Sequence, residues 1–195
     1  MYYFSSDIHF SDESTLRVDN RPFKTTRAFD KYIIKLWNNQ TKKGDIIFVV
    51  GDFVDCDGAE SESWKKAIKY VKKIKADVVL IMGNNEERIV KHFFDGDFEK
   101  FRAFCLETGF KDVLKNAKIE FGGQKFYLVH KPIYHLQNII NLFGHVHRST
   151  GIYREFGFNV GCDLNHFRLY SEQDIFHLID MKNRFWDKDK NIKQQ

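Results

Sequence analysis

Residues 45–55 read DIIFVVGDFVD, an apolar run that ends in two carboxylates. A short continuous run of β-branched and aromatic residues predicts a buried strand, here over 45–50. Gly51 follows where the backbone has to turn sharply or approach a charged cluster, and glycine tolerates both. The stretch therefore predicts a strand that delivers Asp52 from its carboxyl end.

Four further segments place polar residues after strand-like runs in the same way. They are Asp7-Ile8-His9, Gly83-Asn84-Asn85-Glu86, His130 at the end of 126–130, and Gly144-His145-Val146-His147. With Asp52 they offer two carboxylates, an amide and four imidazoles. These are more ligands than one metal ion needs, and they suit two divalent ions that share a bridging group. Singly, each has an ordinary alternative, such as an Asp that caps a turn or a hydrogen-bonded core histidine. Together they predict a metal site.

The spacing of the histidines suggests how two of them reach one site. His145 and His147 are two residues apart, as are Asp7 and His9. In a fully extended strand, residues two apart point to the same face. We therefore expect both members of each pair to approach the metals from one side of an extended strand.

The five segments, in this order, resemble the motifs of the calcineurin-like metallophosphoesterases, and the chain is similar to their small single-domain bacterial or phage-type members. That family has D-x-H, G-D-x-x-D, G-N-H-[DE], a lone His and G-H-x-H, and the resemblance spans residues 7–147. It implies an α/β fold with two mixed β-sheets packed as a sandwich flanked by helices, a four-layer αββα arrangement. Asn85 departs from the pattern, because the family usually has His there.

The resemblance also implies how the ligands divide between two ions. Asp7, His9, Asp52 and His147 would bind one ion; Asn84, His130 and His145 would bind the other, with Asp52 as the bridge. A carboxylate suits the bridge, because it has two oxygens and carries a charge. The mixed nitrogen and oxygen set without thiolate favours Mn, Fe, Ni, Co or Zn over Mg or Ca. The implied reaction is attack on a phosphoester by a hydroxide that bridges the ions.

Asn85 takes the position at which the family histidine is thought to protonate the leaving group. An amide does not titrate near neutrality and cannot be that acid. The enzyme then prefers leaving groups that need little protonation, recruits another acid, or is weakly active. His135 and His166 are the candidate substitutes.

Three further residues carry open alternatives. Asp55 and Glu86 follow their motifs closely and are either second-layer acceptors that orient ligand imidazoles or, respectively, a helix cap and a first-turn helix acid. Arg21 lies in the loop after the first motif and is a candidate substrate contact, since its guanidinium matches a phosphate.

The apolar pattern predicts strands over 2–6, 45–50, 77–82, 118–121, 125–129, 139–143, 152–155 and 158–160. Helices are predicted over 25–39, 60–74, 86–94 and around 99–106. Strand and helix alternate up to residue 95, which indicates a parallel βαβ sheet. Beyond residue 115 the strands are close together, with Gly122-Gly123 as a hairpin turn, so that part should be antiparallel or mixed.

The composition fits one globular domain, 1–195, whose polar end 182–195 we expect to be frayed. No apolar run could cross a bilayer and no signal peptide opens the sequence, so we expect a cytoplasmic protein without a membrane partner. Three cysteines without C-x-x-C spacing indicate free thiols. The net charge of +4 permits nucleic-acid binding without indicating it.

The leading functional hypothesis is therefore a metal-dependent phosphoesterase for phosphodiesters or small nucleotide-like substrates. Hydrolysis of phosphomonoesters, including phosphoproteins, is the alternative within the enzyme class. A non-catalytic protein-binding scaffold on the same fold is the alternative from another class. A scaffold would be free to lose ligands, whereas all the expected ones are present, which favours catalysis.

Overall fold

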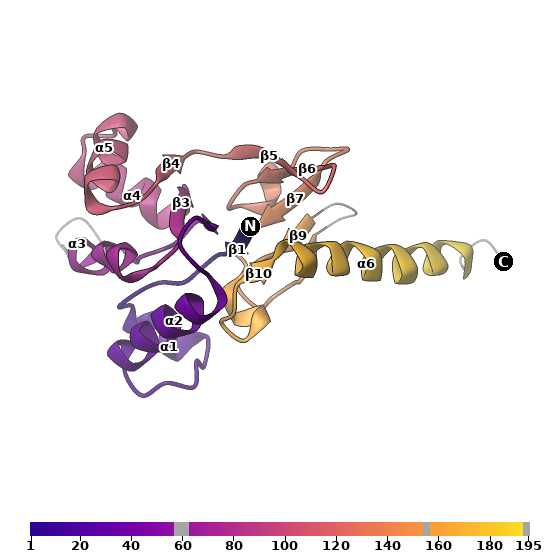
Figure 1. Cartoon of the computed structure of the whole chain (residues 1–195), viewed down its shortest axis with the longest axis horizontal. Helices are drawn as coiled ribbons and strands as arrows, with labels where there is room; N and C mark the ends of the chain where they lie inside the picture. The colour runs from indigo at the N-terminus through magenta and orange to yellow at the C-terminus, as the bar shows by residue number, and fades with distance from the viewer. Residues whose placement is uncertain (57–62, 154–156, 193–195) are drawn as a thin grey trace.

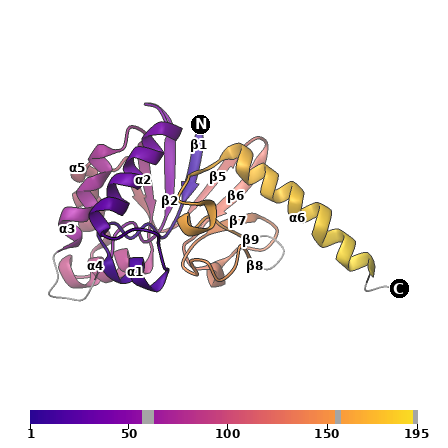
Figure 2. The same cartoon turned by 90° about the horizontal axis from the view of Figure 1, so that it is seen from below.

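The computed structural model describes residues 1–56, 63–153 and 157–192, which form two five-stranded sheets and their flanking helices (Figures 1 and 2). The first sheet has the order β10-β1-β2-β3-β4. Its strands are β1 (Tyr2–Ser5), β2 (Ile46–Val50), β3 (Asp77–Ile81), β4 (Asp112–Leu114) and β10 (Tyr170–Ser171). β1 to β4 are parallel and β10 pairs antiparallel with β1, so the predicted βαβ sheet is confirmed with an antiparallel edge.

The second sheet has the order β5-β6-β7-β9-β8 and is mixed, as predicted. Its strands are β5 (Ala117–Phe121), β6 (Gln124–Leu128), β7 (Ile140–Phe143), β8 (Ile152–Tyr153) and β9 (Gly157–Asn159). The predicted hairpin turn joins β5 to β6, where Gly122 and Gly123 have φ of +56° and +72°. Part of the strand predicted over 152–155 lies outside the described residues.

Helices α1 to α5 gather on one side of the first sheet, and the second sheet lies on its other side (Figures 1 and 2). They are α1 (Glu13–Val18), α2 (Thr26–Gln40), α3 (Trp64–Ala67), α4 (Asn84–Phe93) and α5 (Phe98–Thr108). The helix predicted over 60–74 is α3 followed by a 3₁₀ helix, Ile68–Lys73, and its first residues lie outside the described ones. Short 3₁₀ helices also span Pro132–Tyr134 and Cys162–Asn165. The sandwich of mixed sheets with flanking helices is confirmed.

Two apolar clusters follow from the alternation of side chains along the strands. Ile47 and Val49 of β2 face the helices, whereas Phe48 and Val50 face the second sheet. The inter-sheet cluster is strongly aromatic: the rings of Phe121 and Phe126 stack with centroids 4.0 Å apart. The two sheets are therefore held by apolar burial between facing strands.

The carboxyl-terminal helix α6 (Glu172–Ile192) was not predicted (Figure 1). Ile175 is fully buried and its apolar neighbours, Phe176, Leu178 and Ile179, pack on the inter-sheet cluster. The helix includes residues 182–192 of the end that we expected to be frayed, and 193–195 lie outside the described residues. No helix in the described parts of the chain is both long and apolar enough to cross a membrane.

Candidate metal centre

The carboxyl ends of the central strands bring the five predicted segments together. Ser5 of β1 pairs with Val49 of β2, and Val50 pairs with Ile81 of β3, so these strands end side by side. The backbone N–H of Asp7 donates to Gly51 O at 3.1 Å, which joins the first two motifs. Segments far apart in the sequence therefore place their polar side chains at one edge of the sheet sandwich.

The second sheet brings the last two motifs to the same place. Gly144 N donates to His130 O at 3.0 Å. His145 N donates to both carboxylate oxygens of Asp7 at 3.0 Å, which ties this motif to the first sheet.

The ligand segments are not extended, contrary to the expectation from their spacing. β7 ends at Phe143, and five of the seven predicted ligands have left-handed backbones: Asp7 (φ +57°), His9 (+53°), Asp52 (+52°), His145 (+74°) and His147 (+45°). This conformation is unfavourable for residues with a Cβ by about 1–3 kcal/mol each and concentrates at functional sites. Turns, and not strand alternation, aim these side chains inward.

One group of ligand atoms combines the first and last motifs. Single ligand atoms from Asp7, His9 and His147 all lie within 4.8 Å of one another. His147 Nε2 is 3.9 Å from Asp7 Oδ1. His147 Nδ1 donates to Asp19 Oδ2 at 2.5 Å, so the Nε2 atom is the one left for a metal. Burial lowers the pKa of His147, but the Asp19 carboxylate outweighs this and raises it.

A second group surrounds His130. Its Nδ1 donates to the Val50 carbonyl at 2.8 Å, and its Nε2 lies 3.1 Å from Asn84 Oδ1 and 3.4 Å from Asp52 Oδ2. His145 Nδ1 lies 2.7 Å from the same Asn84 oxygen. Because His145 and Asn84 are not buried while Asp52 and His130 are, the cluster opens to solvent on the side of His145.

Asp52 lies between the two groups. Its Oδ2 is 3.7 Å from His9 Nε2 and 3.4 Å from His130 Nε2. His9 Nε2 is buried and, among the described residues, has no hydrogen-bond partner. Two atoms that each coordinate one ion at about 2.0–2.2 Å lie roughly 3–4 Å apart. The spacing, the unpartnered nitrogen and the donor chemistry therefore all fit divalent metals here.

Without a metal, the cluster is held by charge. Burial lowers the pKa of His130, but its hydrogen bond to the Asp52 carboxylate outweighs this and raises the pKa to about 9. Burial raises the pKa of Asp52, but the charge and hydrogen bond of His130 lower it overall. A proton on His130 thus compensates the buried carboxylates in the absence of cations.

Among the described residues, the hydrogen bonds of Glu86 go to backbone N–H groups and to no ligand imidazole. It is fully buried, its Oε2 accepts from Asp52 N and Gly83 N at 2.9 Å, and its Oε1 accepts from Phe53 N at 3.0 Å. The sequence left two alternatives for Glu86, an acceptor that orients a ligand imidazole or an acid in the first turn of a helix. The structure has Glu86 in the first turn of α4, where its carboxylate also holds the loop of Asp52. Asp55 lies within 4.8 Å of ligand atoms of His9 and Asp12, as an imidazole orienter would.

Arg21 is buried, which argues against the predicted substrate contact. Its Nε and Nη2 donate to Asp163 at 3.0 and 2.8 Å, and its Nη1 and Nη2 donate to the carbonyls of Ile8 and Asp7 at 2.7 Å. Its exposed fraction is only 5%. The guanidinium therefore clamps the loop that carries the first motif, and we withdraw Arg21 as a substrate contact.

Sequence reasoning did not identify two carboxylates that support ligand imidazoles. Asp19 accepts from His147, and Asp12 Oδ2 lies 3.4 Å from His9 Nδ1 while its side chain caps α1. Such carboxylate partners fix the orientation of a ligand histidine. Asp12 does carry the signal of a helix cap, but its proximity to His9 depends on the left-handed turn between them.

The structure gives the surroundings of Asn85 and of the two histidines, His135 and His166, that could replace the proton donor of the family. Asn85 is buried, with 1% of its surface exposed, and its Nδ2 is 3.5 Å from His9 Nδ1. His135 stands against Tyr153, with ring centroids 5.8 Å apart, and His166 is exposed after the 3₁₀ helix Cys162–Asn165. Which group supplies a proton stays a prediction.

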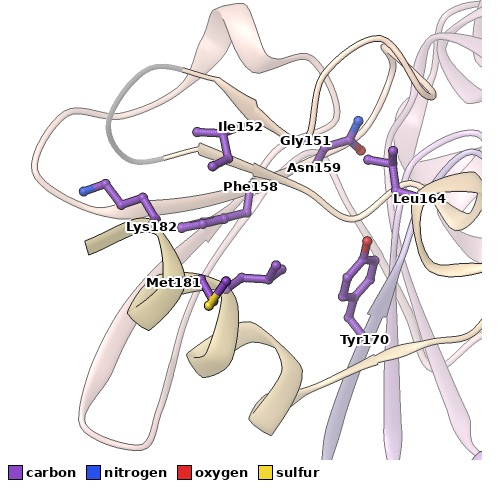
Figure 3. Close-up of a pocket in the computed structure, with 9 residues that line it drawn as sticks. Gly151, Ile152, Phe158, Asn159, Leu164, Tyr170, Met181 and Lys182 are labelled. Atoms are coloured by element: carbon purple, nitrogen blue, oxygen red, sulfur yellow. The ribbon is translucent and has the colours of Figure 1, made fainter. Parts of the chain in front are cut away.

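A separate hollow lies between α6 and the second sheet (Figure 3). Its labelled lining is largely apolar, with Ile152 and Phe158 from the sheet facing Met181 from the helix. The seven predicted ligands take no part in it, so it is distinct from the metal centre.

Comparisons with known proteins give the fold and the family of this chain. A protein of unknown function from Aquifex aeolicus has a similar structure, with a TM-score of 0.67 over 92% of this chain and 99% of its own; at 24% identity it supports the fold alone. An uncharacterized protein of Methanocaldococcus jannaschii is 30% identical over 130 residues, which are 67% of this chain and 58% of that relative. The calcineurin-like phosphoesterase family matches over residues 2–174, so the chain belongs to that family.

Proposed function

We propose that the chain is a phosphoesterase that uses two divalent ions to hydrolyse phosphodiesters or nucleotide-like esters. The observation that carries the proposal is the place of Asp52 Oδ2, 3.7 Å from His9 Nε2 and 3.4 Å from His130 Nε2. A carboxylate between two imidazole nitrogens suits a bridge between two cations. The ligands would be Asp7, His9, Asp52 and His147 for one ion, and Asn84, His130, His145 and the shared Asp52 for the other.

The surrounding residues would prepare this site before substrate binds. Asp19 and the Val50 carbonyl fix the rings of His147 and His130 so that each Nε2 faces the centre. When bound, borderline ions such as Mn, Fe, Ni, Co or Zn supply activated water and neutralise phosphoryl charge. The solvent-facing His145 would line the approach of the substrate.

Proton supply would limit the choice of substrate. Asn85 is an amide and cannot protonate a leaving oxygen near neutral pH. Esters whose leaving groups depart as stable anions should therefore react best. The rate should fall steeply as the leaving-group pKa rises.

The test is hydrolysis of bis- and mono-nitrophenyl phosphate, cyclic nucleotides and single-stranded DNA by the metal-loaded protein. Asp52→Asn should abolish activity and reduce metal content, because the bridging charge is lost at both positions. Asp95→Asn is the control, since that carboxylate is 93% exposed and lies in the loop between α4 and α5. Chelation should inactivate the protein, and Mn should restore it better than Ca. Hydrolysis by protein shown to be metal-free would refute the proposal.

A further inference from the structure

Asn85 connects the cluster of predicted metal ligands to the guanidinium of Arg88, through its backbone N–H and its side-chain amide. Asn85 N donates to Asp52 Oδ1 at 3.0 Å, and its side-chain Nδ2 lies 3.5 Å from His9 Nδ1. On the other side, its Oδ1 accepts a hydrogen bond from Arg88 Nη1 at 3.0 Å. The buried amide therefore holds a guanidinium next to the cluster.

The helix places these two residues together. Asn85 and Arg88 are three apart in α4, so they lie on one face of its first turns. α4 begins at Asn84, itself a predicted ligand, so the positive end of the helix dipole also faces the cluster. Both features favour an anion at this end of the helix.

Arg88 has the capacity to bind that anion. It is exposed and, within the part of the chain that the structure describes, forms no ion pair. Its neighbour Glu87 is engaged by Lys131 at 3.4 Å. A guanidinium has five N–H donors, and the hydrogen bond to Asn85 uses one of them. The remaining donors match the oxygens of a phosphate.

We propose that Arg88 binds a phosphate oxyanion of the ester at the metal centre, and that Asn85 is the positioning residue that holds it there. The inference rests on the proposed phosphoesterase function. The guanidinium of Arg88 stabilises negative charge on the substrate and serves no acid or base role. The amide at position 85 thus has a role that a proton donor would not fill: its fixed carbonyl accepts from the arginine.

The test compares Arg88→Ala with Lys91→Ala, which removes the same charge from an exposed position one turn further along α4. The Mn-loaded protein is titrated with inorganic phosphate by calorimetry, and kcat/KM is measured on bis-nitrophenyl phosphate. Arg88→Ala should weaken both by about ten- to a hundredfold, the range expected when one charged hydrogen bond is lost. Metal content and Tm should not change, and Lys91→Ala should match the original protein. Arg88→Lys should recover only part of the loss.

The positioning role of Asn85 has its own readout. If the amide acts through the arginine, Asn85→Ala should weaken phosphate binding, and the double variant should be no worse than Arg88→Ala alone. Fully additive losses would overturn this role. If the phosphate affinity of Arg88→Ala lies within twofold of that of Lys91→Ala, the proposed phosphate-binding role of Arg88 is wrong. Because calorimetry needs no turnover, a protein that binds phosphate through Arg88 but hydrolyses no ester would refute the enzyme proposal alone.

Discussion

Replacing Glu86 should show how far the candidate metal centre depends on one buried carboxylate. The side chain accepts three backbone N–H groups, from Asp52, Phe53 and Gly83, at 2.9–3.0 Å. Two of these donors belong to the loop that carries Asp52, and the third, Gly83, immediately precedes α4. Glu86 therefore connects two of the five motifs through their backbones.

The expected loss of stability follows from those three hydrogen bonds. A buried donor left without a partner destabilises a protein by about 1–3 kcal/mol. Glu86→Ala leaves three such donors without a partner, so we expect the free energy of unfolding to fall by roughly 3–6 kcal/mol after some relaxation. This is a large part of the typical free energy of unfolding of about 5–15 kcal/mol. Glu86→Gln keeps one acceptor oxygen but turns an amide N–H toward a backbone donor, for a loss of roughly 1–3 kcal/mol.

Urea unfolding of the metal-free protein measures this effect without any contribution from bound ions. Glu87→Gln is the control, because the adjacent carboxylate is 60% exposed and its ion pair with Lys131 is worth at most about 1 kcal/mol. Metal content should also fall in both Glu86 variants, since the Asp52 loop loses its anchor. If Glu86→Ala unfolds at the same urea concentration as Glu87→Gln and only metal affinity drops, Glu86 orients ligands and the backbone argument is wrong.

Three more predictions concern the groups around the site. Arg21→Ala should lower stability by about 3–5 kcal/mol, because Asp163 is left as a buried unpaired charge; a Tm equal to that of Arg17→Ala, an exposed arginine, would contradict this. Asp19→Asn should lower metal affinity about 10–100-fold by releasing His147, measured by competition with a metal-binding dye; unchanged affinity would remove Asp19 from that role. The raised pKa of His130 means that its proton stabilises the metal-free fold fully below about pH 6.5, and that this stabilisation is lost as pH rises through about 9. The free energy of unfolding should then fall by up to roughly 3 kcal/mol. Urea unfolding at pH 6.5 and 9.5 should show this fall, and His130→Gln should make the stability less dependent on pH.

The helices that the sequence did not reveal have local physical reasons. α1 is six residues long, too short to show an apolar period, and it depends on the side chain of Asp12 as its cap. α6 is long, but most of its residues are polar, so its composition resembles that of a tail. Its apolar residues become a stripe only when Ile175 and its neighbours have the inter-sheet cluster to cover.

The sequence by itself determined the α/β class, the parallel first sheet, the hairpin at Gly122-Gly123 and the set of candidate ligands. Local patterns were enough for these features, because strand runs and their polar ends are written in consecutive residues. Only the tertiary structure decided the contacts of Arg21, Glu86 and Asn85. Each could reach several partners from its place in the chain, and the choice depends on which loops meet.

The shape of the ligand loops was likewise decided in three dimensions. Spacing alone placed His145 and His147 on an extended strand, but their backbones are left-handed. Such turns are unfavourable locally and persist only where contacts from other segments hold them, such as the bonds of Asp7 to His145 N and of Asp19 to His147. Short-range preferences thus identify which residues form the candidate centre, and long-range contacts determine how these residues face one another.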